Sequence, residues 1–176
     1  MKRFLVLMAF ALSLTSCVYT VRRNPDGSTT TTQTGGASVS VSVSFGVQVG
    51  NVIQSFQPTK GNGATYFVGE QVSLSFNSRE NGYVTLVIYN PGSFRNSQIS
   101  NIPVARGTNI IPRDFALTAS LPTGVTRFRA FFTPQPSSVS FLNGSGEQYL
   151  ESQTAAYLDP YPVALRDVKE AYLIVR

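Results

Sequence analysis

The sequence predicts an all-β fold on two observations. Apolar residues recur with a period of two along much of the chain, and clusters of glycine, proline and asparagine interrupt that pattern at short intervals. β-Branched and aromatic residues, which favour strands, occupy many of the alternating positions. Short strands separated by such turns are typical of a β-sandwich or a small barrel. We therefore expect one antiparallel β-sandwich domain over residues 37–176.

The first expected strand, Ser38–Val49, alternates very regularly. Its odd positions carry valine or phenylalanine, and its even positions carry serine, glycine or glutamine. Burial of one face would fix the register, because a slip of one residue would turn every apolar side chain to solvent. Gly46 interrupts only the polar face, which indicates a bulge or a close backbone approach. The expected apolar face consists of Val39, Val41, Val43, Phe45, Val47 and Val49.

This strand is also the candidate docking element. A long first strand can lie at the edge of a sheet, where its open backbone pairs with a strand of a partner protein. The alternation is also compatible with a strand of a small membrane β-barrel, in which each strand needs ~9–11 residues of lipid-facing alternation. Only Ser38–Val49 plainly meets that length, so we favour a strand of a soluble sheet.

The segment Gly82–Tyr89 is the expected centre of the core. It is apolar on both faces from Tyr83 onward, as in a strand that is packed from two sides. Its expected hairpin partner is Gln71–Asn77, because only a short polar link separates the two segments. The remaining expected strands are Tyr66–Val68, Ile99–Ala105, Thr108–Ile111, Phe115–Ala119, Val125–Thr133, Ser138–Leu142 and Glu170–Val175.

The strand Val125–Thr133 has two different faces. One face carries two phenylalanines and an alanine, and the other carries two arginines and a phenylalanine. Charged side chains are rarely buried, so we expect Arg127 and Arg129 to face solvent.

One segment departs from the period of two. Glu147–Leu158 places Leu150, Thr154 and Tyr157 at helical spacing and is followed by Pro160. This pattern predicts a short helix or an ordered crossover.

The N-terminus predicts export. Lys2 and Arg3 precede an apolar run that is shorter than the ~20 residues of a membrane-spanning helix, as in a cleaved signal. The next residues, Leu14–Cys17, resemble the lipobox of bacterial lipoproteins. That resemblance implies a signal peptide over residues 1–16 and lipidation of Cys17 by a diacylglycerol; an ordinary secretory signal is the alternative. Two or more acyl chains anchor a protein stably. We expect a protein anchored in the bacterial cell envelope, at the outer membrane if there are two, because Val18 and not aspartate follows Cys17.

Residues 17–36 predict a lipidated N-terminus followed by a flexible tether. They contain many serines and threonines but few large apolar groups, so burial cannot offset the entropy lost on ordering. The alternative is a short hairpin in which Val18–Val21 is a strand and Pro25–Gly27 is the turn.

Two motifs in the first half of the domain point to a family. The segment Tyr66–Val72 followed by Asn81–Val84 resembles the bacterial domain of unknown function 4384, and so does the later order of Ile110–Pro112 and Pro122–Gly124. The resemblance covers about Gln57–Thr133. It implies an immunoglobulin-like β-sandwich on exported or membrane-tethered bacterial proteins, with no known catalytic residues to carry over.

The composition removes several kinds of chemistry. The chain has no histidine and one cysteine, which excludes nucleophiles that rely on a histidine base and metal sites built from imidazole and thiolate. A formal net charge of +5, with arginines scattered along the chain, argues against nucleic-acid binding. We therefore expect no catalytic residue, no cofactor and no metal site.

The leading hypothesis is a non-catalytic β domain, anchored by lipid, that binds or assembles other envelope components such as a surface-layer protein. An envelope hydrolase that uses only carboxylates is the alternative. Glu147 and Glu151 would share one helix face, and paired carboxylates can hydrolyse glycosides; Asp159 is the third candidate. The sequence predicts no oligomeric state.

Overall fold

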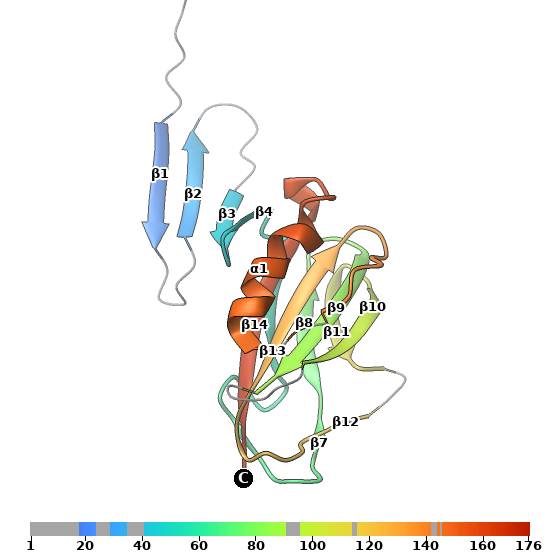
Figure 1. The fold of residues 1–176 in the computed structure, drawn as a ribbon. Helices are drawn as coiled ribbons and strands as arrows, with labels where there is room; N and C mark the ends of the chain where they lie inside the picture. Colours follow the sequence, from blue (N-terminus) through green and yellow to red (C-terminus); the bar gives the residue numbers. More distant parts are fainter. Residues whose placement is uncertain are drawn as a thin grey trace, which may run out of the picture.

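The computed structural model describes residues 18–23, 29–34, 41–90, 96–113, 116–141, 144 and 146–176. Within them the chain folds as an all-β sandwich with one α-helix, α1 (Gly146–Leu158), and a short 3-10 helix, η1 (Val163–Leu165) (Figure 1). The expected signal peptide and Cys17 lie outside the described residues. No helix in the described ranges is long and apolar enough to cross a membrane.

The largest sheet has five strands, and its neighbours are antiparallel except for one parallel pair, β14 with β6. In spatial order they are β10 (Ser97–Val104), β9 (Gly82–Tyr89), β13 (Gly124–Thr133), β14 (Asp167–Val175) and β6 (Thr65–Tyr66).

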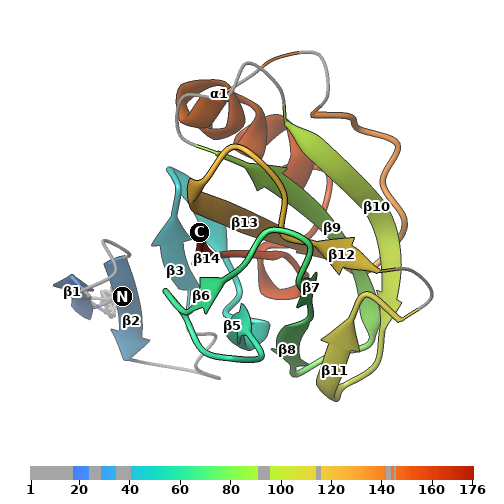
Figure 2. The same cartoon turned by 90° about the horizontal axis from the view of Figure 1, so that it is seen from below.

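A smaller sheet packs against the five-stranded sheet, and a two-stranded pair closes one end of the sandwich (Figure 2). The smaller sheet contains β11 (Gly107–Ile111), β8 (Leu74–Ser78) and β5 (Ile53–Pro58). The pair at the end consists of β12 (Leu117–Thr118) and β7 (Gln71–Val72).

The five-stranded sheet is buried on both faces. Its inner face forms the sandwich core with the small sheet, and residues such as Leu74, Phe76 and Leu86 are fully buried there. Its outer face packs against α1, where Phe131 stacks on Phe141 with ring centroids 4.7 Å apart. The helix therefore covers the side of the sheet that the small sheet does not, as Figure 2 shows.

The prediction of a central strand is confirmed by β9. Val84 and Leu86 contact the sandwich core, whereas Val87 and Tyr89 contact the helix side. The predicted hairpin partner is wrong, because β9 pairs with β10 and β13, and the segment before it lies in the other sheets as β7 and β8. The link of three residues between β8 and β9 crosses between the sheets instead of turning within one.

The other predicted elements are partly confirmed. The predicted helix is confirmed by α1. The expected strand Ser138–Leu142 is not a strand in its described residues, and β5 was not expected. The apolar alternation of β5 is weak, because Gln54 and Ser55 are both exposed. They lie beside a register shift in the pairing of β5 with β8.

Two side-chain amides hold the segment 137–141 along β10, at the edge of the large sheet. Gln98 donates to Val139 O at 3.2 Å and accepts from Phe141 N at 2.6 Å. Asn101 donates to Ser137 O at 3.0 Å and accepts from Ser137 N at 2.8 Å. These amides replace a strand ladder, so the segment lies beside a sheet edge without being a strand itself.

The regular ribbon Ser38–Val49 is not one strand. It folds back at Phe45-Gly46 into the hairpin of β3 (Val41–Ser44) and β4 (Val47–Val49), and both turn residues have positive φ, 51° and 76°. Such a two-residue turn favours glycine because glycine reaches positive φ without strain. A Cβ at Gly46 would meet nothing within 4 Å, so the expected bulge or close approach is wrong and the glycine serves the turn.

The hairpin also changes which residues stand opposite each other. The register pairs Ser44 with Val47 and Ser42 with Val49, so the serines of β3 face the valines of β4 across the ladder. The register thus does not place Val47 and Val49 opposite the valines of β3. The side chains of residues 39–43 lie outside the described part of the structure.

The N-terminal strands extend this hairpin into a four-stranded sheet. Its order is β1 (Val18–Arg23), β2 (Thr29–Thr34), β3 and β4, all antiparallel. The described part of the expected tether is thus paired as a hairpin, which was the alternative reading of residues 18–34. Because β3 lies between β2 and β4, its backbone is not at an edge.

The outer side of β4 is covered by the segment around η1. Gly50 N donates to Arg166 O at 2.9 Å, and Arg166 Nε donates to Gln48 O at 2.9 Å. A Cβ at Gly50 would lie 2.5 Å from the carbonyl oxygens of Val163 and Ala164, so only glycine allows this approach. The predicted docking edge is therefore occupied by the chain's own residues.

Candidate functional site

A cavity of about 420 Å³ lies at one end of the sandwich, between the large sheet and the short β7–β12 pair. This volume falls in the range of small-ligand pockets. Strands β9, β10, β13 and β14 supply one side of it, and β7, β12 and the loop after β12 supply the other. The lining comprises Val72, Ile88, Tyr89, Asn90, Ser97, Ile99, Leu117, Thr118, Ala119, Ser120, Leu121, Pro122, Thr126, Phe128, Leu173 and Val175.

The floor of the cavity is the apolar core itself. Val72, Phe128 and Leu173 are buried and also belong to the core between the sheets. Ile88 and Ile99 follow the alternation of β9 and β10 but are only half-buried. The reason is geometric, because the β7–β12 pair is two residues long and covers less of this end than the three-stranded sheet covers elsewhere.

The walls of the cavity carry neutral polar groups. Ser97, Thr118, Ser120 and Thr126 contribute hydroxyls, and no charged side chain is among the described residues that line the cavity. Asn90 also lines it, and the Oδ1 atom of Asn90 is buried without a hydrogen-bond partner. Buried polar atoms are normally paired, so this acceptor is an exception within the described residues.

The rim of the cavity is apolar and open to solvent. Leu121, in the loop after β12, is 70% exposed. Val125, near the start of β13, is also exposed. Phe67 and Val68 lie at the same end of the molecule, because Val68 N donates to Arg176 O beside the start of β13. Several exposed large apolar side chains therefore lie at the end of the molecule where the cavity is found.

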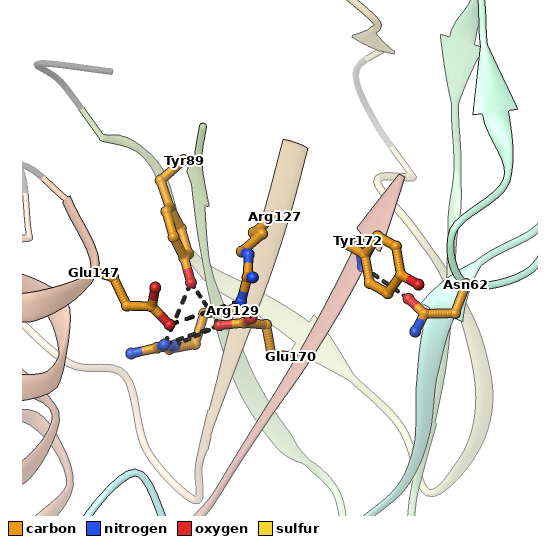
Figure 3. Close-up of polar contacts among 7 residues, drawn as sticks. All are labelled: Asn62, Tyr89, Arg127, Arg129, Glu147, Glu170 and Tyr172. Carbon is orange, nitrogen blue, oxygen red and sulfur yellow. Dashed lines mark hydrogen bonds and ion pairs between the residues drawn. The ribbon is translucent and has the colours of Figure 1, made fainter. Parts of the chain in front are cut away.

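A second group of side chains lies on the outer face of the large sheet and is joined by ion pairs (Figure 3). Glu170 on β14 is its centre. Its carboxylate accepts from Arg127 Nη1 at 2.8 Å, from Arg129 Nη2 at 2.8 Å and from Tyr89 Oη at 2.7 Å. Glu147 on α1 adds a looser ion pair, 3.7 Å from Arg127 Nη1. We call these five residues the Glu170 cluster.

The strand register builds the Glu170 cluster. Arg129 stands directly opposite Glu170 in the β13–β14 ladder, and Arg127 stands opposite Tyr89 in the β13–β9 ladder. The ring of Phe45, in the β3–β4 turn, then covers Arg129 at 3.9 Å from the centroid. As a result, the side chain of Arg129 is fully buried.

The expectation that both arginines face solvent is therefore wrong for Arg129. Arg127 remains about a third exposed, whereas Arg129 is 0% exposed. The strand alternation placed both arginines on the correct face. It could not show that α1 and the Phe45 turn cover that face, because both come from distant parts of the chain.

The chemistry of the Glu170 cluster is that of a structural ion network. Burial and the hydrogen bond to Glu170 raise the pKa of Tyr89 well above its ordinary value, so Tyr89 stays protonated and acts as a donor. Glu170 already accepts four hydrogen bonds from three residues. No described member of the cluster except Tyr89 lines the cavity.

The carboxylates considered for hydrolysis are not brought together at the cavity. Glu147 lies beside Arg127, Asp159 accepts from Arg166 at 3.0 Å, and Glu151 is exposed on α1. None of the three is among the described lining residues. Within the described ranges, no three histidine, cysteine or acidic side chains are grouped so that they could hold a metal ion.

One further acid is buried, on the inner face of β14. Asp167 is 2% exposed and accepts from Ile53 N at 2.7 Å and Val168 N at 2.8 Å. Burial raises its pKa from an ordinary 3.8 to about 6, against the lowering effect of these backbone donors. Its contacts tie β5 to β14, which gives it a structural role.

The described residues of the predicted docking strand contact the rest of the domain and do not line the cavity. Val47 and Val49 are buried against the helix side, and Phe45 lies over Arg129, so they stabilise the domain from within. Sequence reasoning missed the cavity, whose described lining comes from six separate segments of the chain. The only local signal was Leu121-Pro122, an apolar pair in a turn.

Comparison with known proteins adds no family. No protein-family model matches the chain, and no curated protein matches it.

Proposed function

We propose that the protein is a lipid-anchored, non-catalytic module of the bacterial cell envelope that binds or assembles other envelope components. The observation that carries the proposal is the cavity, whose described lining residues include no charged side chain and whose rim carries an exposed leucine. Such a cavity is suited to holding part of another molecule, because burial of its apolar floor and rim would stabilise a complex.

The placing of the charged groups also supports a binding role. Two acids of the large sheet, the partly buried Glu170 and the buried Asp167, are engaged by arginines or by backbone N–H groups. A catalytic acid or base must instead reach a substrate. The cavity, where a substrate would fit, offers hydroxyls and an amide among its described residues but no carboxylate.

The envelope location rests on the N-terminal pattern. The basic start, the short apolar run and the resemblance of Leu14–Cys17 to a lipobox support export and lipidation. Metabolic labelling with a radioactive fatty acid tests this part, and the Cys17→Ser variant is the control. We expect label on the wild-type chain and none on the variant; equal labelling of both would contradict lipidation at Cys17.

The binding role is tested by photocrosslinking in intact cells. A photoreactive amino acid at Leu121, on the rim, is compared with one at Leu165, an exposed leucine outside the cavity lining. We expect one reproducible crosslinked envelope protein from position 121 that is absent from position 165. If position 121 gives the same crosslinks as position 165, or none, the proposed function is wrong.

A further inference from the structure

The small sheet ends in β11, which pairs on one side only within the described residues. It is the last strand in the order β11, β8, β5, and its register joins it to β8 alone (Figure 2). In an antiparallel pair, alternate residues of each strand direct their N–H and C=O groups away from the partner. β11 therefore presents backbone donors and acceptors on the side that faces away from β8.

The other edges of the two packed sheets are covered or very short. Residues 137–141 lie along β10, and β6 is two residues long. β5 lies beside β14, where Asp167 accepts from Ile53 N at 2.7 Å. On β11, the only further contact of a backbone group within the described residues is at the first residue, where Asn109 Nδ2 donates to Gly107 O at 3.1 Å.

β11 carries none of the features that usually keep an edge strand from pairing. Natural edge strands are protected by charges, prolines or bulges. The five residues Gly107–Ile111 include no charge and no proline, and their register with β8 is continuous. On the solvent face, Thr108 is exposed and Ile110 is 46% exposed. The side chains of an added strand would contact these two residues.

Cations stand at both ends of β11. Arg106 directly precedes the strand, Arg113 follows it by two residues, and both are exposed. Arg79 belongs to the first of these ends, because Arg106 N donates to a side chain in the link between β8 and β9 at 2.8 Å. None of the three arginines is paired with an acid of the described residues. The acids next to them in the sequence are Glu80 and Asp114, and Asp114 lies outside the described residues.

The arginines argue against a second copy of this chain as the added strand. Two identical strands related by a two-fold axis pair antiparallel. A pair centred on Asn109 would thus bring Arg106 of each copy near Arg113 of the other. Like charges that stand opposite each other across two strands are destabilising. A strand with acids near its ends would be attracted instead.

We propose that β11 is a docking edge that binds an extended, acidic segment of a partner protein as an additional strand. Backbone hydrogen bonds hold the segment along β11, and Arg106 and Arg113 attract an acid near each of its ends. The five residues of β11 span about 17 Å, which is the length of a partner strand of about five residues. No residue of β11 is among the described residues that line the cavity, so the inference goes beyond the proposed function.

The test is a binding measurement with the full chain in phosphatidylcholine nanodiscs. The probe is a fluorescent octapeptide with glutamate at each end and alternating threonine and valine between them. The first comparison peptide has lysine in place of both glutamates. The second keeps the glutamates but has methylated nitrogens at all central residues, which removes the backbone donors. Fluorescence anisotropy gives the dissociation constant of each peptide, and amide hydrogen exchange shows which strand is covered.

We expect the glutamate peptide to bind at least about tenfold more tightly than either comparison peptide. Amide exchange over Gly107–Ile111 should slow at least about fivefold when this peptide binds, whereas exchange over β6 should not change. Arg106→Glu should weaken binding about three- to tenfold, because it reverses one of the attracting charges. The matched control, Arg176→Glu, should change binding less than about twofold, because Arg176 is exposed beside β6.

Each part of the inference has an outcome that overturns it. Equal binding of the glutamate and lysine peptides, or equal weakening by the two variants, overturns the acidic partner. Equal binding of the methylated peptide, or unchanged exchange over Gly107–Ile111, overturns strand addition to β11. No binding of any peptide overturns both.

Two further results separate this inference from other interactions of the chain. Protection of Gly107–Ile111 that rises with the concentration of the chain alone would replace the acidic partner by a second copy. Crosslinks from position 121 test the cavity and not β11. Peptide binding without those crosslinks therefore supports the docking edge and overturns the proposed function, and the converse result overturns the docking edge alone.

Discussion

The two faces of β13 show how one strand can be buried in two different ways. Its inner face places Phe128 and Phe132 in the sandwich core, where burial of apolar surface suffices. Its outer face carries Arg129, which is equally buried but stands opposite Glu170 and beneath Phe45. The inner face needs only neighbours of suitable volume, whereas the outer face needs particular partners at particular positions. Burial of a charge therefore depends on the strand register.

The largest expected effect comes from removing the charge partner on the outer face. Glu170→Ala leaves the buried guanidinium of Arg129 without its carboxylate, and we expect a loss of about 3–5 kcal/mol in unfolding free energy. Urea unfolding followed by circular dichroism measures it. Glu80→Ala, which changes an exposed acid, should stay within about 0.5 kcal/mol.

The double variant Arg129→Met/Glu170→Met sharpens the same comparison. It replaces the ion pair by apolar side chains, so that this part of the outer face is buried in the same way as the apolar inner face. We expect it to recover most of the stability that Glu170→Ala loses, because no buried charge remains unpaired. A double variant as unstable as Glu170→Ala would contradict the view that the unpaired charge causes the loss.

The second prediction compares Glu170 with Asp167, the buried acid of the inner face, which has backbone donors instead of arginines. Its folded pKa of about 6 lies above the ordinary 3.8, so its stabilising contribution is fully present below pH 3.8 and is lost as pH rises through 6. The difference between the folded and the ordinary pKa of Asp167 corresponds to about 3 kcal/mol of unfolding free energy, at 1.36 kcal/mol per pKa unit.

The measurement for Asp167 is the unfolding free energy of the wild-type chain and of Asp167→Asn between pH 4 and 7. We expect the wild-type chain to gain stability relative to the variant as the pH is lowered from 7 to 4. Subtracting the two curves removes the contributions of the other carboxylates. Parallel curves would contradict burial as the cause of the raised pKa.

A smaller effect is expected where the outer face joins neutral polar groups. Tyr157 on α1 donates to Thr85 Oγ1 of β9 at 2.7 Å, and both side chains are buried. Tyr157→Phe removes the hydroxyl but keeps the ring stack, so we expect a loss of about 1 kcal/mol by thermal unfolding. Tyr161→Phe, whose hydroxyl makes only an exposed contact, is the control and should be near neutral.

The smallest effect concerns the cover over Arg129. Phe45→Leu keeps an apolar side chain in the turn but removes the aromatic face, and we expect a loss of about 0.5–1 kcal/mol. Phe67→Leu, at an exposed phenylalanine, is the matched control. In Arg129→Met/Glu170→Met, Phe45→Leu should lose less than in the wild-type chain; an equal loss would show that the cation does not contribute.

The ribbon and the central strand differ in how far their patterns could be interpreted. The apolar run of β9 indicated a strand that is packed from two sides, and the sandwich core and the helix side supply those two sides. The alternation of Ser38–Val49 was just as regular, yet the segment turns back at Phe45-Gly46. A period of two survives a two-residue turn, so periodicity alone could not locate the hairpin.

The candidate site was less predictable than the fold. The lining residues of the cavity come from segments that are far apart in the sequence; Val72 and Ile88, for example, are 16 positions apart. The Glu170 cluster has the same character, because Arg129 and Glu170 are 41 positions apart. Local patterns predicted which face a side chain takes but not what covers that face.

The sequence by itself determined the all-β class, the central strand, a helix or ordered crossover over Glu147–Leu158 and the absence of histidine from the chain. These follow from local periodicity and composition, which act within a few residues. Only the tertiary structure decided that Arg129 is buried, that the ribbon is a hairpin and that one end of the sandwich is open. Those features depend on contacts between distant segments, and the free energy of such contacts is set by register and packing.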